Sequence, residues 1–398
     1  MRKLLLLLLP LCLLLLLSAR LRPLNLAAFS APAGERLTVN DPNAPVLPNG
    51  RVLTPRGRHI KIAAHPYGLV LSPDGKTLAA SCNGTEPFAV SLISDLTSRT
   101  PALAQIVADR ERYRGSKASE DAEDEEFRSV FMGVAIAPDN RTLYAASGNQ
   151  GSVFVFDLQE RKRIATIKLN DQQYRDSFLG ALVLTRDGRR LYVLDQANYR
   201  VATVDPQQRT VIESQPTGRA PFSLALSPDE RKLYVTNVGL FRYALVAGYD
   251  AKDPLRTGLS FPPFGFPSEQ ARAGVTVEGK RVPGLGDPNA VEAASLWAYE
   301  VGSEGRLRVI AKTKTGRLIG ATANGIQVIG SSSPSGVVAG RNHVFVSNAN
   351  NDSVTVLDAA NNKVVANLEL NLFDEACASK EKISDDDVTR SVNNFHKL

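Results

Sequence analysis

Few side chains in this 398-residue sequence are spaced like a catalytic or metal-binding set. The four histidines, at positions 59, 65, 343 and 396, are not paired at ligand spacing, and no cysteine pair joins them. The Gly-x-Ser-x-Gly elbow of many hydrolases is absent, and so is the haem-attachment motif Cys-x-x-Cys-His. The sequence therefore predicts no catalytic residue, no metal site and no cofactor.

Two stretches imitate functional motifs. Residues 274–280 have the glycine and lysine spacing of a phosphate-binding loop, but Arg281 stands where that loop needs Ser or Thr. The surrounding pattern predicts a small hairpin with a Glu-Gly turn instead. The serines between 331 and 335 surround Pro334, which predicts the turn into an inner strand.

A repeated strand–turn–strand pattern explains most of the chain. Pro73 fixes φ at the first corner of the turn, Asp74 favours a turn, and Gly75 tolerates positive φ. The equivalent acids Asp187 and Asp229 are therefore expected to be carboxylates of separate turns, not an acidic cluster. The five copies occupy residues 68–83, 133–148, 180–196, 223–238 and 336–349.

Two further strands follow most copies. The third strands are expected at 153–158, 201–206 and 354–359, and the fourth at 163–169, 210–215 and 363–370. Four short strands per unit, repeating every ~42 residues where no insertion intervenes, are typical of a propeller blade. The sequence predicts an all-β fold: a β-propeller of the seven-blade type with five to six blades of four-stranded antiparallel sheet.

Two insertions interrupt the repeat. Residues 108–127 are rich in Arg, Asp and Glu, which indicates a solvated loop or a partner contact. Residues 251–294 are rich in Pro and Gly and are expected to form a long loop over one face of the blades.

The loops that lead into the innermost strands carry the candidate binding residues. Aromatic and basic groups at one mouth of a propeller would suit a small anionic ligand or a protein or peptide partner. The alternative is that the aromatic rings pack between neighbouring blades. The candidates are His65, Tyr67, Met132, Phe178, Arg219, Phe222 and Ser335.

The segment Tyr234-Val235-Thr236-Asn237 resembles the signature of YVTN-repeat β-propellers, and Phe345-Val346-Ser347-Asn348 is a close variant. The stretches 47–84, 283–301 and 331–340 also resemble the N-terminal propeller of bacterial secreted proteins in which a propeller precedes an alkaline-phosphatase-type phosphoesterase domain. This resemblance covers residues 47–371 and implies a non-catalytic binding scaffold. The repeat stops near Asn371, so the phosphoesterase half and the last blades are expected to be absent.

Two other functions stay open. Some propellers similar to the YVTN kind are lactonase-like hydrolases of sugar-acid lactones, which would need His, Glu and Arg side chains converging on the channel. A redox-associated periplasmic propeller would need a cofactor partner.

The N-terminus carries an export signal. Arg2 and Lys3 precede a leucine-rich run from 4 to 17, which predicts a signal peptide over 1–33; an uncleaved anchor is the alternative. We therefore expect an exported protein, periplasmic or extracellular, with no membrane span after signal removal, a propeller over 34–371 and an irregular tail over 372–398. Cys82 is expected to be a buried thiol, or else to pair with Cys377. The formal net charge of +6 gives no nucleic-acid footprint.

Overall fold

A computed structural model gives the structure of the protein for residues 60–84, 88–107, 127–265, 268–323 and 325–370. The chain divides into two compact units, 1–62 and 63–398. Everything below concerns the second unit. The predicted signal peptide, most of the acidic insertion 108–127, the tail 372–398 and Cys377 lie outside the described residues. Within those residues, no helix has the length and apolar character needed to cross a membrane.

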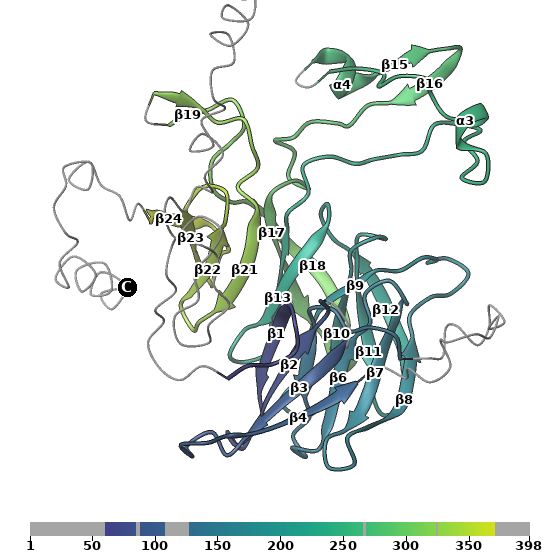
Figure 1. Ribbon diagram of the computed structural model, residues 1–398. Helices are drawn as coiled ribbons and strands as arrows, with labels where there is room; N and C mark the ends of the chain where they lie inside the picture. Colours follow the sequence, from purple (N-terminus) through teal and green to yellow (C-terminus); the bar gives the residue numbers. More distant parts are fainter. Residues whose placement is uncertain (1–59, 85–87, 108–126, 266–267, 324, 371–398) are drawn as a thin grey trace, which may run out of the picture. The chain divides into compact units, whose positions relative to one another are not determined.

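Five four-stranded antiparallel sheets form most of the regular structure in the described part of the second unit (Figure 1). In four of them the strands are consecutive in the chain. We name the five sheets blades A to E in chain order. Blade A contains β1 (Pro66–Leu71), β2 (Leu78–Cys82), β3 (Ala89–Ser94) and β4 (Ala102–Val107); blade B contains β5 (Val134–Ile136), β6 (Thr142–Ala146), β7 (Ser152–Asp157) and β8 (Lys162–Lys168); blade C contains β9 (Leu179–Leu184), β10 (Leu191–Asp195), β11 (Arg200–Asp205) and β12 (Thr210–Pro216).

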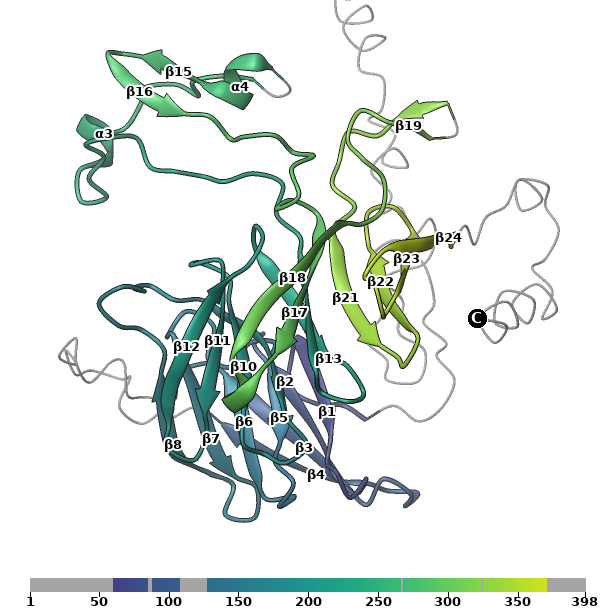
Figure 2. The same ribbon diagram turned by 180° about the vertical axis from the view of Figure 1, so that it is seen from behind.

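Blade D is interrupted by the long insertion. Its strands are β13 (Pro221–Leu226), β14 (Lys232–Asn237), β17 (Ser295–Val301) and β18 (Leu307–Lys314), with residues 238–294 between β14 and β17 (Figure 2). The insertion contains α3 (Pro254–Thr257), α4 (Glu269–Ala273) and the hairpin of β15 (Gly274–Val277) and β16 (Lys280–Pro283). A 3-10 turn (Ser303–Gly305) joins β17 to β18. The linker to the next blade carries the short pair β19 (Thr322–Ala323) and β20 (Ile326–Gln327), and blade E contains β21 (Pro334–Ala339), β22 (His343–Asn348), β23 (Ser353–Asp358) and β24 (Val364–Glu369).

The hairpin turn between the first and second strand of a blade has the predicted chemistry. Asp74, Asp187 and Asp229 each accept a 2.6 Å hydrogen bond from the Ser or Thr hydroxyl two residues earlier. The residue after each acid has positive φ, which Gly75 adopts at 71° and Glu230 at 57°. The three carboxylates thus close separate turns, as the sequence predicts.

Apolar side chains fill the space between consecutive blades. Inner and middle strands alternate so that each blade presents buried residues to both neighbours. Four core clusters join the blades in chain order: Leu92 with Phe154 between A and B, Val155 with Val193 between B and C, Tyr192 with Trp297 between C and D, and Leu296 with Val346 between D and E.

Glycines let the innermost strands approach each other. A Cβ on Gly68 would lie 1.8 Å from the carbonyl oxygen of Met132 in the next blade, and one on Gly133 would lie 2.6 Å from that of Gly180. The Gly133 amide instead donates a 3.1 Å hydrogen bond to the Gly180 carbonyl. Neighbouring blades therefore touch, backbone to backbone, close to where their first strands begin.

Candidate functional site

The leading edge of each blade, where its first strand begins, also holds the end of the second strand, the start of the third and the end of the fourth. Strand register shows this in blade D, where Asn237 pairs with both Pro221 and Ser295, and Ser295 pairs with Lys314. The loops that join these strand ends therefore all emerge at this end of the blade, which we call its leading edge. The predicted binding residues lie in these loops or at the starts of the first strands.

An aromatic row runs along the leading edge of three consecutive blades. The ring centroids of Tyr67 and Phe131 are 5.4 Å apart, and those of Phe131 and Phe178 are 5.0 Å apart in an edge-to-face arrangement. Tyr67 remains 57% exposed, whereas Phe131 and Phe178 are half-buried. The rings therefore pack between blades and still present an aromatic surface to solvent.

The remaining predicted residues take no part in the ring contacts of this row. Met132 is half-buried, and its backbone carbonyl accepts a 3.3 Å hydrogen bond from Ser81 of the preceding blade. His65 is exposed with φ of 50° just before β1. Phe222 on β13 and Ser335 on β21 are half-buried, and no ring contact or side-chain hydrogen bond involves them among the described residues.

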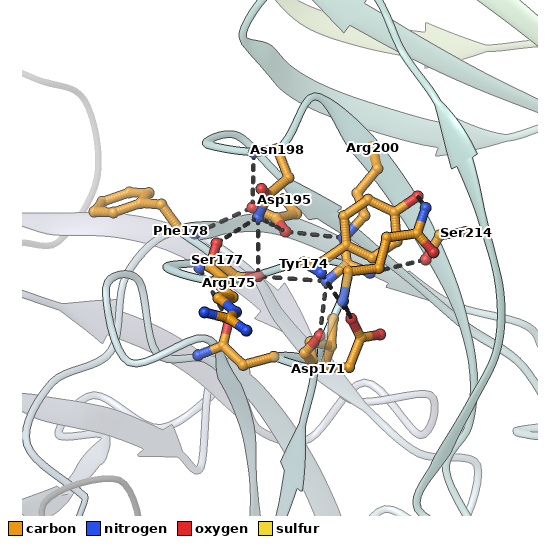
Figure 3. Close-up of polar contacts among 12 residues, drawn as sticks. Asp171, Tyr174, Arg175, Ser177, Phe178, Asp195, Asn198, Arg200 and Ser214 are labelled. Carbon is orange, nitrogen blue, oxygen red and sulfur yellow. Dashed lines mark hydrogen bonds and ion pairs between the residues drawn. The ribbon is translucent and has the colours of Figure 1, made fainter. Parts of the chain in front are cut away.

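A buried ion pair holds the loop that ends in Phe178 (Figure 3). Arg200 and Asp195 are 1% and 0% exposed, and Nε of Arg200 donates a 2.9 Å hydrogen bond to Oδ2 of Asp195. The other carboxylate oxygen accepts the Phe178 amide at 3.1 Å. Asp195 therefore links the second strand of blade C directly to the backbone of the aromatic row.

All three nitrogens of the Arg200 guanidinium donate hydrogen bonds. The group donates to the Leu169 carbonyl at 2.7 Å, to Ser214 at 2.9 Å and to Ser177 at 3.3 Å, and it stacks 3.8 Å above the Tyr174 ring (Figure 3). A buried charge is tolerated when such bonds replace the lost water. The ion pair thus has a structural role, because it holds the loop 169–178 in place.

Equivalent positions in other blades are uncharged. In blade D the amide of Asn237 donates to the hydroxyl of Ser295 at 3.3 Å, and in blade E Asn348 donates to Ser353 at 3.2 Å. Each pair joins the end of the second strand to the start of the third, as Asp195 and Arg200 do. The charge at this position is visible in the sequence, because Asp195 stands where the YVTN-like segment of blade D has Asn237. Its partner Arg200 lies five residues later, and the repeat pattern does not predict that the two side chains pair.

A second polar cluster lies on blade D. The sequence predicted one of its members, Arg219, but not the other, Lys314. Arg219 precedes β13, and its Nη1 donates to the carbonyls of Asp287, at 3.0 Å, and Leu240. Lys314 ends β18, and its ammonium donates to the carbonyls of Ala290, at 3.3 Å, and Ala293. Burial lowers the pKa of Lys314 to about 8.

Other sequence motifs have purely local roles. The stretch that imitates a phosphate-binding loop forms the β15–β16 hairpin, with positive φ at Glu278 and Gly279 as its turn requires. The thiol of Cys82 is buried beside Ser91, and burial raises its pKa. Its pairing with Cys377 stays a prediction. The described residues hold no group of three or more His, Cys, Asp or Glu side chains that could bind a metal ion.

Comparison with known proteins gives structural likeness alone. No family model matches the sequence, and no curated protein does. The chain is similar to a periplasmic gluconolactonase from Pseudomonas aeruginosa, with 18% identity, coverage of 82% of this chain and 76% of that one, and a TM-score of 0.47. It is also similar to a functionally unknown protein from Desulfotomaculum acetoxidans (12% identity, 80% and 74% covered, TM-score 0.44) and to a candidate 6-phosphogluconolactonase from Bacteroides uniformis (12%, 78% and 86%, 0.42).

The sheets themselves define the class. Four-stranded antiparallel sheets that repeat along the chain and pack face to face through apolar clusters are propeller blades. The chain is an all-β protein of the β-propeller type, with five blades in the part that the structure describes.

Proposed function

We propose that this chain is an exported, non-catalytic binding propeller whose leading edge takes a small anionic ligand. The observation that carries the proposal is the aromatic row of Tyr67, Phe131 and Phe178, which spans three blades and leaves Tyr67 57% exposed. Exposed aromatic rings on a rigid scaffold provide large contact areas at low entropic cost.

The backing of the row supports this proposal. The carbonyl beside Gly68 belongs to Met132, the neighbour of Phe131, and the amide of Phe178 is held by buried Asp195. The backbone beside two of the three rings is therefore held by contacts within or between blades. A surface ordered before binding loses little conformational entropy when a ligand arrives.

The test begins with a ligand screen on the mature chain. Melting temperatures are measured with sugar acids, dicarboxylates, sugar phosphates and short peptides, and each stabilising compound is titrated by calorimetry. We expect Tyr67→Ala to raise the Kd about fivefold, because a lost ring contact is worth about 1 kcal/mol. Leu103→Ala, which removes an exposed apolar side chain from β4, is the matched control and should bind as wild type does. Unchanged affinity in Tyr67→Ala would contradict the proposal. If only the peptides stabilise the chain, the partner is a protein and not a small anionic ligand.

A lactonase-like hydrolase is the second candidate. It is favoured by Lys314, whose pKa of about 8 suits a base near neutral pH, with the guanidinium of Arg219 in the same cluster. The described contacts do not join His65 to these two residues. Hydrolysis of an aldonolactone followed in a pH-stat would decide: a rate no higher than that of buffer alone removes this candidate, and a rate abolished by Lys314→Gln would favour it.

The wider organisation stays a proposal as well. We place the signal peptide at 1–33, the propeller at 34–371 and the tail at 372–398. The resemblance to propellers that precede a phosphoesterase is in keeping with a scaffold role, and the redox-associated alternative remains a prediction.

A further inference from the structure

Two cations meet the end of the long insertion at the leading edge of blade D. Lys314 is the last residue of β18 and pairs with Ser295, the first residue of β17. Arg219 is two residues before β13, and its amide donates a 2.7 Å hydrogen bond to the Glu292 carbonyl. Both therefore face the stretch 287–293, where the insertion returns to the blade.

The guanidinium of Arg219 is held on one side. Its Nη1 bonds the carbonyls of Asp287 and Leu240, while no contact involves its Nε or Nη2 within the described residues. Beside Nη2 lies Gly286, with φ of 83°, where a Cβ would come within 3.1 Å of that nitrogen. Any larger residue at 286 would place a side chain against Nη2, whereas glycine places none there. The Nε and Nη2 donors form a planar fork of the kind that carboxylates and phosphates bind.

The ammonium of Lys314 is held in the same way. It uses two of its three donors on the carbonyls of Ala290 and Ala293. Burial is the largest cause of its lowered pKa; the positive charge of Arg219 lowers it further, and the carboxylates of Asp287 and Glu292 act in the opposite direction. The Glu292 carboxylate lies 4.0 Å from Lys312, an exposed neighbour.

Neither cation forms an ion pair with another described residue. Among the residues that the structure describes, neither Arg219 nor Lys314 has a carboxylate oxygen within 4 Å, and both are held by backbone dipoles alone. Two like charges that are partly shielded from water, each with donors to spare, favour an anion between them.

We propose that Arg219 and Lys314 form an oxyanion site at the base of the insertion, which binds a carboxylate or phosphate group of a small ligand. The inference rests on the proposed binding function and names the chemical group that the ligand must carry. Arg219 grips the anion with its free edge and Lys314 with its third proton, while the four carbonyls keep both cations in place.

The binding test uses two simple anions. Sulfate stands for tetrahedral oxyanions and acetate for carboxylates, and neither changes charge between about pH 7 and about pH 9.5. Calorimetric titration should give millimolar binding of at least one of them, and Arg219→Gln and Lys314→Gln should each weaken it about tenfold. Lys363→Gln removes an exposed cation from the turn before β24 and should have no effect. The anion that binds more tightly identifies the ligand class.

A second measurement needs no variant of the site. Bound anion favours the charged ammonium, so affinity should fall as the pH rises through about 8, and saturating anion should raise the pKa of Lys314, measured by NMR of the lysine side chains. Absence of binding by both anions at about 100 mM, wild-type affinity in both Gln variants, or an unchanged pKa of Lys314 would overturn the proposal.

The two proposals fail separately. Tyr67→Ala should leave sulfate and acetate binding unchanged, because the aromatic row belongs to other blades. If sulfate or acetate binds as expected but Tyr67→Ala leaves the affinity for the screened ligand unchanged, the aromatic surface is refuted. If Tyr67→Ala weakens binding of the screened ligand but neither sulfate nor acetate binds, the oxyanion site is refuted.

Discussion

Asp195 and Arg200 bury two opposite charges at a position where blades D and E use Asn and Ser. Neutral pairs satisfy the same strand ends without the cost of removing charges from water. The charged pair makes additional hydrogen bonds, to the backbone amide of Phe178 and the carbonyl of Leu169, besides joining its own strands. We infer that the charges were placed to fix the loop of the aromatic row.

A double-mutant cycle tests that role. Arg200→Ser leaves Asp195 buried without its cation and should lower the free energy of unfolding by about 3–5 kcal/mol. Adding Asp195→Asn recreates the Asn–Ser pair of blades D and E and should recover at least about 1 kcal/mol of that loss. Urea unfolding gives both values, and a double variant as unstable as the single one would argue against the equivalence of the three pairs.

At the scale of elements, the hairpin turns concentrate the titratable contacts. Hydroxyl donors and backbone amides hold the pKa of Asp187 and Asp229 below the ordinary value. These carboxyls bind protons more tightly in the unfolded chain, so their contribution to stability is complete above about pH 5 and is lost as the pH falls through about 4 towards the folded pKa.

The expected consequence is a stability that declines in acid and declines less when a turn carboxylate is removed. Asp187→Asn and Asp229→Asn should each flatten the fall in unfolding free energy between about pH 5 and about pH 3.5 by less than about 1 kcal/mol, since both groups are largely exposed to solvent. Urea titrations at a series of pH values measure the slope; variants with the wild-type slope would show that these bonds persist in the unfolded chain.

Contact between elements depends on the inner-strand glycines. Gly133→Ala would place a methyl group 2.6 Å from the Gly180 carbonyl and 2.7 Å from the Leu182 amide, both backbone atoms of the next blade. We expect a loss of about 1–3 kcal/mol, because one inner strand must shift. Gly330→Ala, where nothing lies within 4 Å of the added carbon, should change stability by less than about 0.5 kcal/mol. Equal melting temperatures for the two variants would contradict this account.

For the whole molecule, the decisive question is export. The leucine-rich run predicts that a bacterial host with a general secretory pathway delivers the protein outside the cytoplasm and removes the segment. The cleavage point should lie in the segment from Ala27 to Ala33, which intact mass and N-terminal sequencing would show. A full-length chain that stays with the membrane fraction would establish the uncleaved anchor instead.

The blades could be predicted from the amino-acid sequence alone. Strand alternation, Pro and Asp at the first hairpin turn and a positive-φ position after the acid are local features, so the repeat, its five copies and the β15–β16 hairpin could be predicted from short segments. The same locality explains why Phe178 could be predicted in the loop before its strand; Tyr67, predicted in the same kind of loop, lies at the start of β1 itself. A residue's position within a repeat does not depend on what the neighbouring blade contains.

Which side chains contact each other depends on how the blades pack. Phe131, which joins Tyr67 to Phe178, was not among the predicted residues, and neither were Arg200 and Lys314. Phe131 contacts rings from the blades on either side, Arg200 bonds the Leu169 carbonyl 31 residues earlier, and Lys314 bonds two carbonyls of the insertion 21 and 24 residues earlier. Side-chain contacts of this kind are fixed by the packing of one blade against the next and by the path of the insertion, and neither is encoded in the period of the repeat.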